Sequence, residues 1–296
     1  MSVSEQTRKA FKMIEEGVEQ LRSSEKYREY LRSLSKFHDY SFNNTLLILS
    51  QCPNASMIAG FNTWKNEFNR RIRKGEKSIK ILAPYKVKHS IIKKEEMDEN
   101  GNETHVEKQI SITKFRPVNV FDVSQTEGDA LPSLTKELIG SSESSIGLIE
   151  AIKEISEIPV LFRTKEEDPS LASAKGYFQY GENDKSIVIR KDMGINQQAK
   201  TLVHEFAHSI LHENSTKERK VKEIEAESLA FVISNHFGLD TSDYSFGYIQ
   251  SWSASKTNEE LRNVLEDIQE QADRMIFMIE PVFKRRMKDD GKSITQ

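Results

Sequence analysis

The stretch Thr201-Leu202-Val203-His204-Glu205-Phe206-Ala207-His208 places two histidines and a glutamate in a His-Glu-x-x-His pattern. If the stretch is helical, His204 and His208 lie one turn apart on the same face. Two neutral imidazoles at this spacing can bind one zinc ion, and Glu205 can act as general base on water at that ion. The motif predicts a catalytic zinc site, and a chance match on an ordinary amphipathic helix is the alternative.

A zinc site of this kind needs a third protein ligand and an open position. The helix expected from about 217 to 237 carries Glu223 and Glu227 on the same stripe as two alanines. An inward-facing carboxylate needs a metal ion or a hydrogen-bond partner. His212 lies one turn beyond His208, and we expect a role other than ligand for it, because three stacked side chains of one straight helix cannot converge on one ion.

The region before the motif predicts a mixed α/β module. A helix is expected through Ile149 and Ile155, followed by a strand at 159–162. Two antiparallel strands are expected at 174–180 and 186–189, around a turn. An edge strand that precedes the metal helix is a common way to hold an extended peptide, although the same strand would also serve a purely structural sheet.

The first part of the chain predicts helices followed by a small sheet. Apolar residues recur at helical spacing from about 5 to 36, interrupted at Ser23 and Ser24. Ser41 or Asn43 is placed to cap the next helix, which Pro53 ends. Strands are expected at 79–85, 87–92, 109–115 and 118–123, with an Asn-Gly turn signal in the polar tip at 98–102.

Composition and charge indicate two modules with different partners. The chain has 296 residues, of which 30% are charged and 36% hydrophobic, as in globular proteins. Residues 1–125 hold 22 Lys/Arg and 16 Asp/Glu, which leaves 21 and 30 for the rest. No apolar run approaches a membrane span, no signal-peptide core is present, and Cys52 is the single cysteine, so we expect a cytoplasmic protein without a membrane partner.

The basic segment of the first module predicts a surface for single-stranded nucleic acid. Residues 65–94 contain eleven Lys/Arg and two acidic residues, with aromatic residues nearby. Cations follow the phosphates of such a ligand, and exposed rings stack on its bases. The alternative is that the aromatic side chains are core and the charges line a solvated strand face.

Three stretches of the first module resemble the N-terminal domain of ArdC-type antirestriction proteins. They are 40–48 (YSFNNTLLI), 59–64 (AGFNTW) and 73–84 (RKGEKSIKILAP), and the resemblance extends over about residues 5–125. It implies a single-stranded DNA-binding domain of plasmids and other mobile elements, joined to a metallopeptidase-like domain. The hairpin expected around 93–108 is longer than the form typical of the family. The expected DNA contacts are Tyr40, Asn44, Trp64, Arg71, Arg73, Lys74, Lys77 and Lys80.

The second module, over about residues 146–240, resembles His-Glu-x-x-His zinc peptidase-like domains of the ImmA/IrrE kind. In these families the third ligand is a glutamate in a Glu-x-x-Ala pattern, and the sequence from Glu223 to Ala226 matches it. Glu227 stands where the family has asparagine. The resemblance therefore implies Glu223 as third ligand, with Glu227 as its competitor or as the acceptor of a histidine N–H.

We therefore expect an α+β protein of two domains. An N-terminal DNA-binding domain at 1–125 is followed by a linker at 126–145 and a zincin-like metallopeptidase domain at 146–296. The expected activity is zinc-dependent peptide hydrolysis of an unnamed protein substrate, with His204, His208 and Glu223 as ligands and Glu205 as base, in an antirestriction factor of a mobile element. The alternatives are a non-catalytic DNA-binding antirestriction protein with a structural metal site, and a peptidase that cleaves a regulatory protein.

Overall fold

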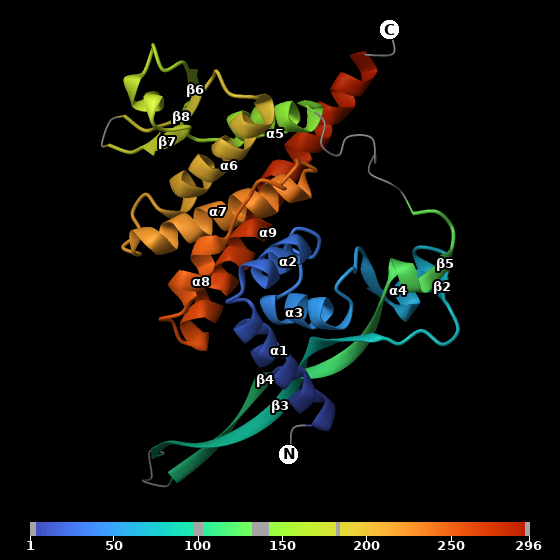
Figure 1. The fold of residues 1–296 in the computed structure, drawn as a ribbon. Helices are drawn as coiled ribbons and strands as arrows, with labels where there is room; N and C mark the ends of the chain where they lie inside the picture. Colours follow the sequence, from blue (N-terminus) through green and yellow to red (C-terminus); the bar gives the residue numbers. More distant parts are fainter. Residues whose placement is uncertain (1–3, 98–102, 132–141, 182–183, 294–296) are drawn as a thin grey trace.

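A computed structural model describes residues 4–97, 103–131, 142–181 and 184–293 of the chain. The predicted α+β class is confirmed, because helices and small sheets occur in both modules (Figure 1). In the described residues, no helix is both long enough and apolar enough to cross a membrane.

The first module begins with three helices, which cover the base of a long β-ribbon. They are α1 (Glu5–Gln20), α2 (Ser24–Leu34) and α3 (Phe42–Gln51). The side chain of Ser41 accepts a hydrogen bond from the backbone N–H of Asn44, so the predicted cap of α3 is confirmed at Ser41. The break predicted at Ser23 and Ser24 is also present, between α1 and α2.

The ribbon consists of β3 (Ile79–Met97) and β4 (Glu103–Asp122), paired antiparallel, and β1 (Ile58–Gly60) pairs with the other edge of β4. The sequence predicted a break near residue 86, but β3 is continuous. Pro84 lies within it, opposite Phe115, and proline is tolerated there because β3 is an edge strand. The polar tip predicted at 98–102 lies outside the described residues.

A smaller unit lies beside the ribbon. It contains α4 (Phe61–Asn66), η1 (Val123–Gln125) and a separate sheet of β2 (Arg70–Ile72) with β5 (Thr126–Gly128). β5 lies in the segment expected to be a linker, and it pairs with β2 of the first module. At the other end of that segment, α5 begins at Ser142, four residues before the expected start of the second module.

The second module places a three-stranded sheet against a layer of helices (Figure 1). The sheet has the order β6-β8-β7, in which β6 (Val160–Arg163) is parallel and β7 (Gly176–Gln179) antiparallel to β8 (Ser186–Arg190). The pair predicted at 174–180 and 186–189 is thus confirmed. A short helix, η3 (Pro169–Ala172), precedes β7. The larger helices are α5 (Ser142–Ile155), α6 (Ile195–Leu211), α7 (Arg219–His236), α8 (Gly247–Ser253) and α9 (Asn258–Ser293).

The two modules share one hydrophobic core. A continuous cluster of buried residues extends from α1, α2 and α3 to α5, α6, α7 and α9. Tyr27 and Tyr30 of α2 are completely buried, and their hydroxyl groups bond to Ser228 of α7 at 2.7 Å and to Gln269 of α9 at 3.2 Å. The helix that carries part of the predicted metal site therefore packs directly on the first module.

Candidate metal centre

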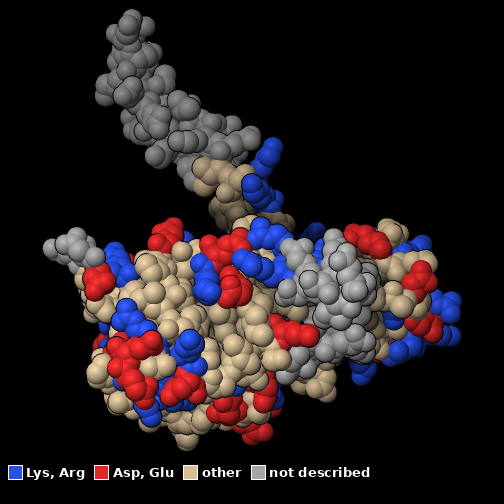
Figure 2. Space-filling view, turned by 90° about the horizontal axis from the view of Figure 1, so that it is seen from above, with Lys and Arg blue, Asp and Glu red and all other residues tan. Residues whose placement is uncertain are grey.

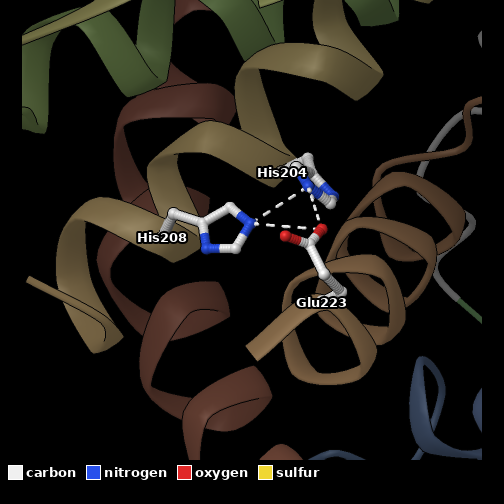
Figure 3. A group of neighbouring side chains, drawn as sticks. All are labelled: His204, His208 and Glu223. Carbon is white, nitrogen blue, oxygen red and sulfur yellow. Dashed lines mark hydrogen bonds and ion pairs between the residues drawn. The ribbon is translucent and has the colours of Figure 1, made fainter. Parts of the chain in front are cut away.

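The predicted motif lies on α6, with one face of the helix in the core and the other toward α7. Leu202, Val203 and Phe206 are buried, which fixes the rotation of the helix about its axis. His204 and His208 therefore point together toward the gap between α6 and α7, where Glu223 meets them (Figure 3).

The ligand atoms of the three side chains converge. The Nε2 atoms of His204 and His208 are 3.1 Å apart, and Oε2 of Glu223 lies 3.7 and 3.8 Å from them. Two nitrogen ligands of a tetrahedral zinc ion are about 3.3 Å apart at the usual Zn–N bond length. Two imidazoles and one carboxylate are also the donor types that divalent zinc accepts. Donor set and spacing thus fit such an ion.

The opposite ring nitrogens face a second set of side chains. Nδ1 of His204 lies 3.2 Å from Oε2 of Glu227, and Nδ1 of His208 lies 2.8 Å from Nδ1 of His212. Glu227 is therefore placed as a hydrogen-bond acceptor, on the side of His204 that is turned away from Glu223. His212 is likewise a neighbour of His208 rather than a fourth member of the cluster.

Ionic contacts within the cluster shift its proton affinities. Burial acts to lower the pKa of His204, but the bonds to Glu223 and Glu227 outweigh it and raise this pKa to about 10. The hydrogen bonds that Glu223 accepts from His204 and His208 hold the pKa of Glu223 well below its usual range. Zinc binding requires a neutral imidazole, so metal uptake must release the proton that His204 holds.

Glu205 lies beside the cluster in the wall of a cavity of about 350 Å³. Glu205 is 9% exposed, and its carboxylate lies close to the backbone of Phe178 in β7. Burial raises the pKa of Glu205, while the neighbouring histidines act in the opposite direction. A carboxylate whose pKa is raised towards neutrality is a better proton acceptor for water than an ordinary surface glutamate.

The strand β7 approaches this site very closely. A Cβ atom on Gly176 would lie 2.8 Å from the Cγ2 atom of Thr201 and 2.9 Å from the carbonyl oxygen of Val188. Only glycine allows β7 to pack this near α6. The close packing places Phe178 next to Glu205, and Gly176 itself lines the cavity.

The predicted DNA contacts of the first module fall into two groups. In the first, the side chains hold the fold together. Trp64 is completely buried and donates its indole N–H to the carbonyl of Phe121 at 2.9 Å. The amide of Asn44 bonds to both the N–H and the carbonyl of Leu82. Trp64 was expected among the DNA contacts, but its indole has no exposed face on which a base could stack.

The second group lies at the surface. Arg71 and Arg73 are exposed and pair with Glu127 and Glu76, each at 2.8 Å. The half-buried Lys80 reaches Asn119 at 3.0 Å. Lys74 and Lys77 are exposed, whereas Tyr40 is half-buried with its hydroxyl 3.5 Å from the carbonyl of Ile58. The charges of Arg71 and Arg73 are thus already paired within the protein, whereas Lys74 and Lys77 are exposed.

Exposed aromatic side chains also occur at positions outside the predicted DNA contacts. Phe61 is 55% and Phe115 49% exposed, and Tyr85 on β3 lies under the guanidinium of Arg116, 5.7 Å from its ring centre. Figure 2 shows Lys and Arg side chains at the base of the projecting ribbon, while both signs of charge are interspersed over the rest of that face. Strand alternation in 79–88 was the available signal for an exposed Tyr85.

Comparisons with known proteins match each module to a family. Residues 3–121 match the N-terminal domain of the anti-restriction factor ArdC. Residues 162–248 match the IrrE N-terminal-like domain of the M78 peptidases.

Full-length comparisons give more distant likenesses. An uncharacterised Bacillus anthracis protein, pXO2-81, is 26% identical over 93% of this chain, which spans 51% of that protein's length. The metal-free crystal structure of the antirestriction ArdC protein of plasmid R388 has a TM-score of 0.48 and 16% identity, covering 83% of this chain and 86% of that one. Its Mn(II)-bound form gives a TM-score of 0.47 and 14% identity, covering 86% and 97%.

Proposed function

Since the chain is an ArdC-like protein, with an ArdC-type N-terminal domain followed by an IrrE-like M78 domain, we propose that it is a zinc-dependent peptidase that also binds single-stranded DNA and acts in antirestriction. The observation that carries the catalytic part is the convergence of His204, His208 and Glu223 beside the buried carboxylate of Glu205.

Three of these residues bind the metal ion, and Glu205 transfers protons. His204, His208 and Glu223 hold the ion, which when bound acts as a Lewis acid and makes water more acidic. Glu205 accepts the proton of the attacking water and returns it to the departing amine. The backbone of Phe178 lies close to the carboxylate of Glu205, and β7 is an edge strand along which an extended peptide can lie.

The experiment has two stages. The zinc content of the purified wild type is measured beside that of His204→Ala, and near-stoichiometric zinc in the wild type alone is expected. Cleavage of a random peptide library is then compared between wild type and Glu205→Gln. This variant keeps zinc and loses cleavage if Glu205 is the base, whereas cleavage at the wild-type rate would refute the mechanism.

DNA binding is supported by a separate observation. Exposed cations on and beside β2 lie in the same module as the exposed rings of Phe61, Tyr85 and Phe115. Phosphates and bases of a single strand need these two kinds of group. Protection of unmodified plasmid DNA in a restricting host, measured for wild type and Glu205→Gln, separates the two activities. Equal protection favours the non-catalytic alternative, in which DNA binding alone protects.

A further inference from the structure

A chain of buried polar groups leads from His208 away from the metal centre. Nδ1 of His208 lies 2.8 Å from Nδ1 of His212, and Nε2 of His212 lies 2.9 Å from Oε2 of Glu225. The other oxygen of Glu225 accepts a hydrogen bond from Lys217 at 2.6 Å, and Lys217 also reaches Asp267 of α9 at 2.9 Å. Together they connect α6, α7 and α9.

The inner members of the chain are shielded from water. His212 is 6% and Glu225 2% exposed, so solvent supplies few alternative partners to either side chain. A carboxylate with so little exposure is costly unless both oxygens are hydrogen-bonded. Glu225 has both bonds, from His212 and from Lys217.

The two ends of the chain fix the direction of every bond. A metal-facing Nε2 of His208 must carry no hydrogen, so the neutral ring carries it on Nδ1 and donates it to His212. His212 then has its own hydrogen on Nε2 and donates it to Glu225. The ammonium of Lys217 can only donate, which keeps one Glu225 oxygen occupied and leaves the other for His212.

We propose that His212, Glu225 and Lys217 are positioning residues that hold His208 in the tautomer required for metal binding. This inference rests on the proposed function, because it assumes that His208 is a ligand. His204 achieves the same end with one carboxylate, Glu227. For His208, the carboxylate of Glu225 acts through the ring of His212. Because Lys217 can only donate, it fixes which atom donates in each hydrogen bond between His208 and Glu225.

The variant Glu225→Gln tests the direction of the chain. Lys217 will bind the amide oxygen of the new glutamine, so its NH₂ group faces Nε2 of His212. His212 must then carry hydrogen on Nδ1, and His208 carries it on the metal-facing Nε2. We expect zinc affinity, measured by competition with a chromogenic chelator, to fall by about 10- to 100-fold.

A second substitution should reverse this loss. In Glu225→Gln/Lys217→Met nothing holds the amide oxygen, so the amide turns its oxygen to His212 and most of the zinc affinity returns. A purely structural role for Glu225 would make the double variant worse than the single one. The matched control, Asp267→Ala, removes the other hydrogen-bond acceptor of Lys217 and should leave zinc affinity within about twofold of wild type.

The outcomes separate this inference from the proposed function. A wild type that binds no zinc refutes the proposed function. Two results would overturn the positioning role alone, in a wild type that binds zinc. Either Glu225→Gln binds zinc as tightly as the wild type, or the double variant recovers no zinc affinity. Ring-nitrogen NMR of the zinc-loaded wild type gives a check without any variant. Hydrogen on Nδ1 of His208 and on Nε2 of His212 is expected, and the same tautomer in both rings would overturn the inference.

Discussion

Tyr27 on α2 and Ser228 on α7 share a hydrogen bond of 2.7 Å between their hydroxyl groups, and both side chains are completely buried. The bond joins the first module to the helix that carries Glu223. Burial raises the pKa of Tyr27, so its hydroxyl stays protonated throughout the working range of a protein. The two modules are thus linked by specific polar contacts inside a shared core.

The first prediction concerns this bond. Tyr27→Phe leaves the Ser228 hydroxyl buried without its partner, which should lower the free energy of unfolding by about 1–3 kcal/mol. Urea unfolding followed by circular dichroism measures the change. In Tyr27→Phe/Ser228→Ala the unsatisfied group is gone, so we expect a smaller loss than the sum of the two single variants. Additive losses would show that the bond contributes no coupling.

The second prediction concerns the approach of β7 to α6. Gly176→Ala places a methyl group against Thr201 and the Val188 carbonyl, so β7 must move away from Glu205. We expect a loss of about 1–3 kcal/mol in unfolding free energy and slower peptide cleavage. Gly181→Ala is the matched control, because a Cβ atom there meets nothing within 4 Å. Equal behaviour of the two variants would contradict the close-packing argument.

The third prediction distinguishes the two candidate carboxylate ligands. Glu223 faces the Nε2 atoms of both histidines, whereas Glu227 faces only Nδ1 of His204. Glu223→Gln should therefore weaken zinc binding more than Glu227→Gln, whose effect we expect to be about 10- to 100-fold. Chelator competition gives both values, and Glu218→Gln, at the exposed position just before the same helix, is the control. The reverse order would make Glu227 the ligand.

The fourth prediction concerns acid stability at the junction of the modules. Burial lowers the pKa of His236, His38 acts in the same direction, and the Ser35 carbonyl and Glu280 oppose them. Below about pH 6.5 the unfolded chain takes up a proton that the folded histidine resists, so stability should fall as the pH falls through this range.

A conservative variant isolates this effect. His236 lies 2.8 Å from the Ser35 carbonyl through Nδ1, and the amide of His236→Asn can donate the same bond without titrating. Unfolding free energies measured between pH 7.5 and pH 5 should therefore decline less steeply in His236→Asn than in wild type. Parallel curves would show that another group dominates this range.

The fifth prediction concerns DNA. Lys74→Ala/Lys77→Ala removes two exposed cations beside β2 and should weaken the binding of labelled single-stranded oligonucleotides of different sequence about equally. The slope of log affinity against log salt should fall by about two. Lys165→Ala, an exposed lysine of the second module, is the control. An unchanged slope in the double variant would exclude these lysines from the phosphate contacts.

Helical spacing in the sequence predicts the two histidines of the metal centre, but it does not identify the carboxylate ligand. The i, i+4 spacing of His204 and His208 requires a shared face, and the structure has it. Glu223 and Glu227 also differ by four residues on one face, so spacing cannot separate them. The choice depends on which ring nitrogen each carboxylate meets, and that depends on how α6 and α7 pack.

The first module was harder to interpret for a related reason. Trp64 sits in a short helix next to a basic segment, and the sequence alone does not say whether its ring faces solvent or core. Likewise, Tyr27 and Tyr30 have the spacing of a buried helix face, but their partners lie 201 and 239 residues away in the chain. The charge asymmetry indicated two modules, but it carries no information about the hydrophobic core that they share.

The shared core also has a consequence for the order of synthesis. α9 contributes Leu261, Leu265, Ile268 and Met275 to a cluster that begins with Ala10 and Ile14 of α1. Chains emerge from the ribosome from the N-terminus, so the first three helices are made long before the helix that completes their burial. During that interval the three helices expose apolar surface, to which chaperones bind. The shared core can form only after α9 has been synthesised.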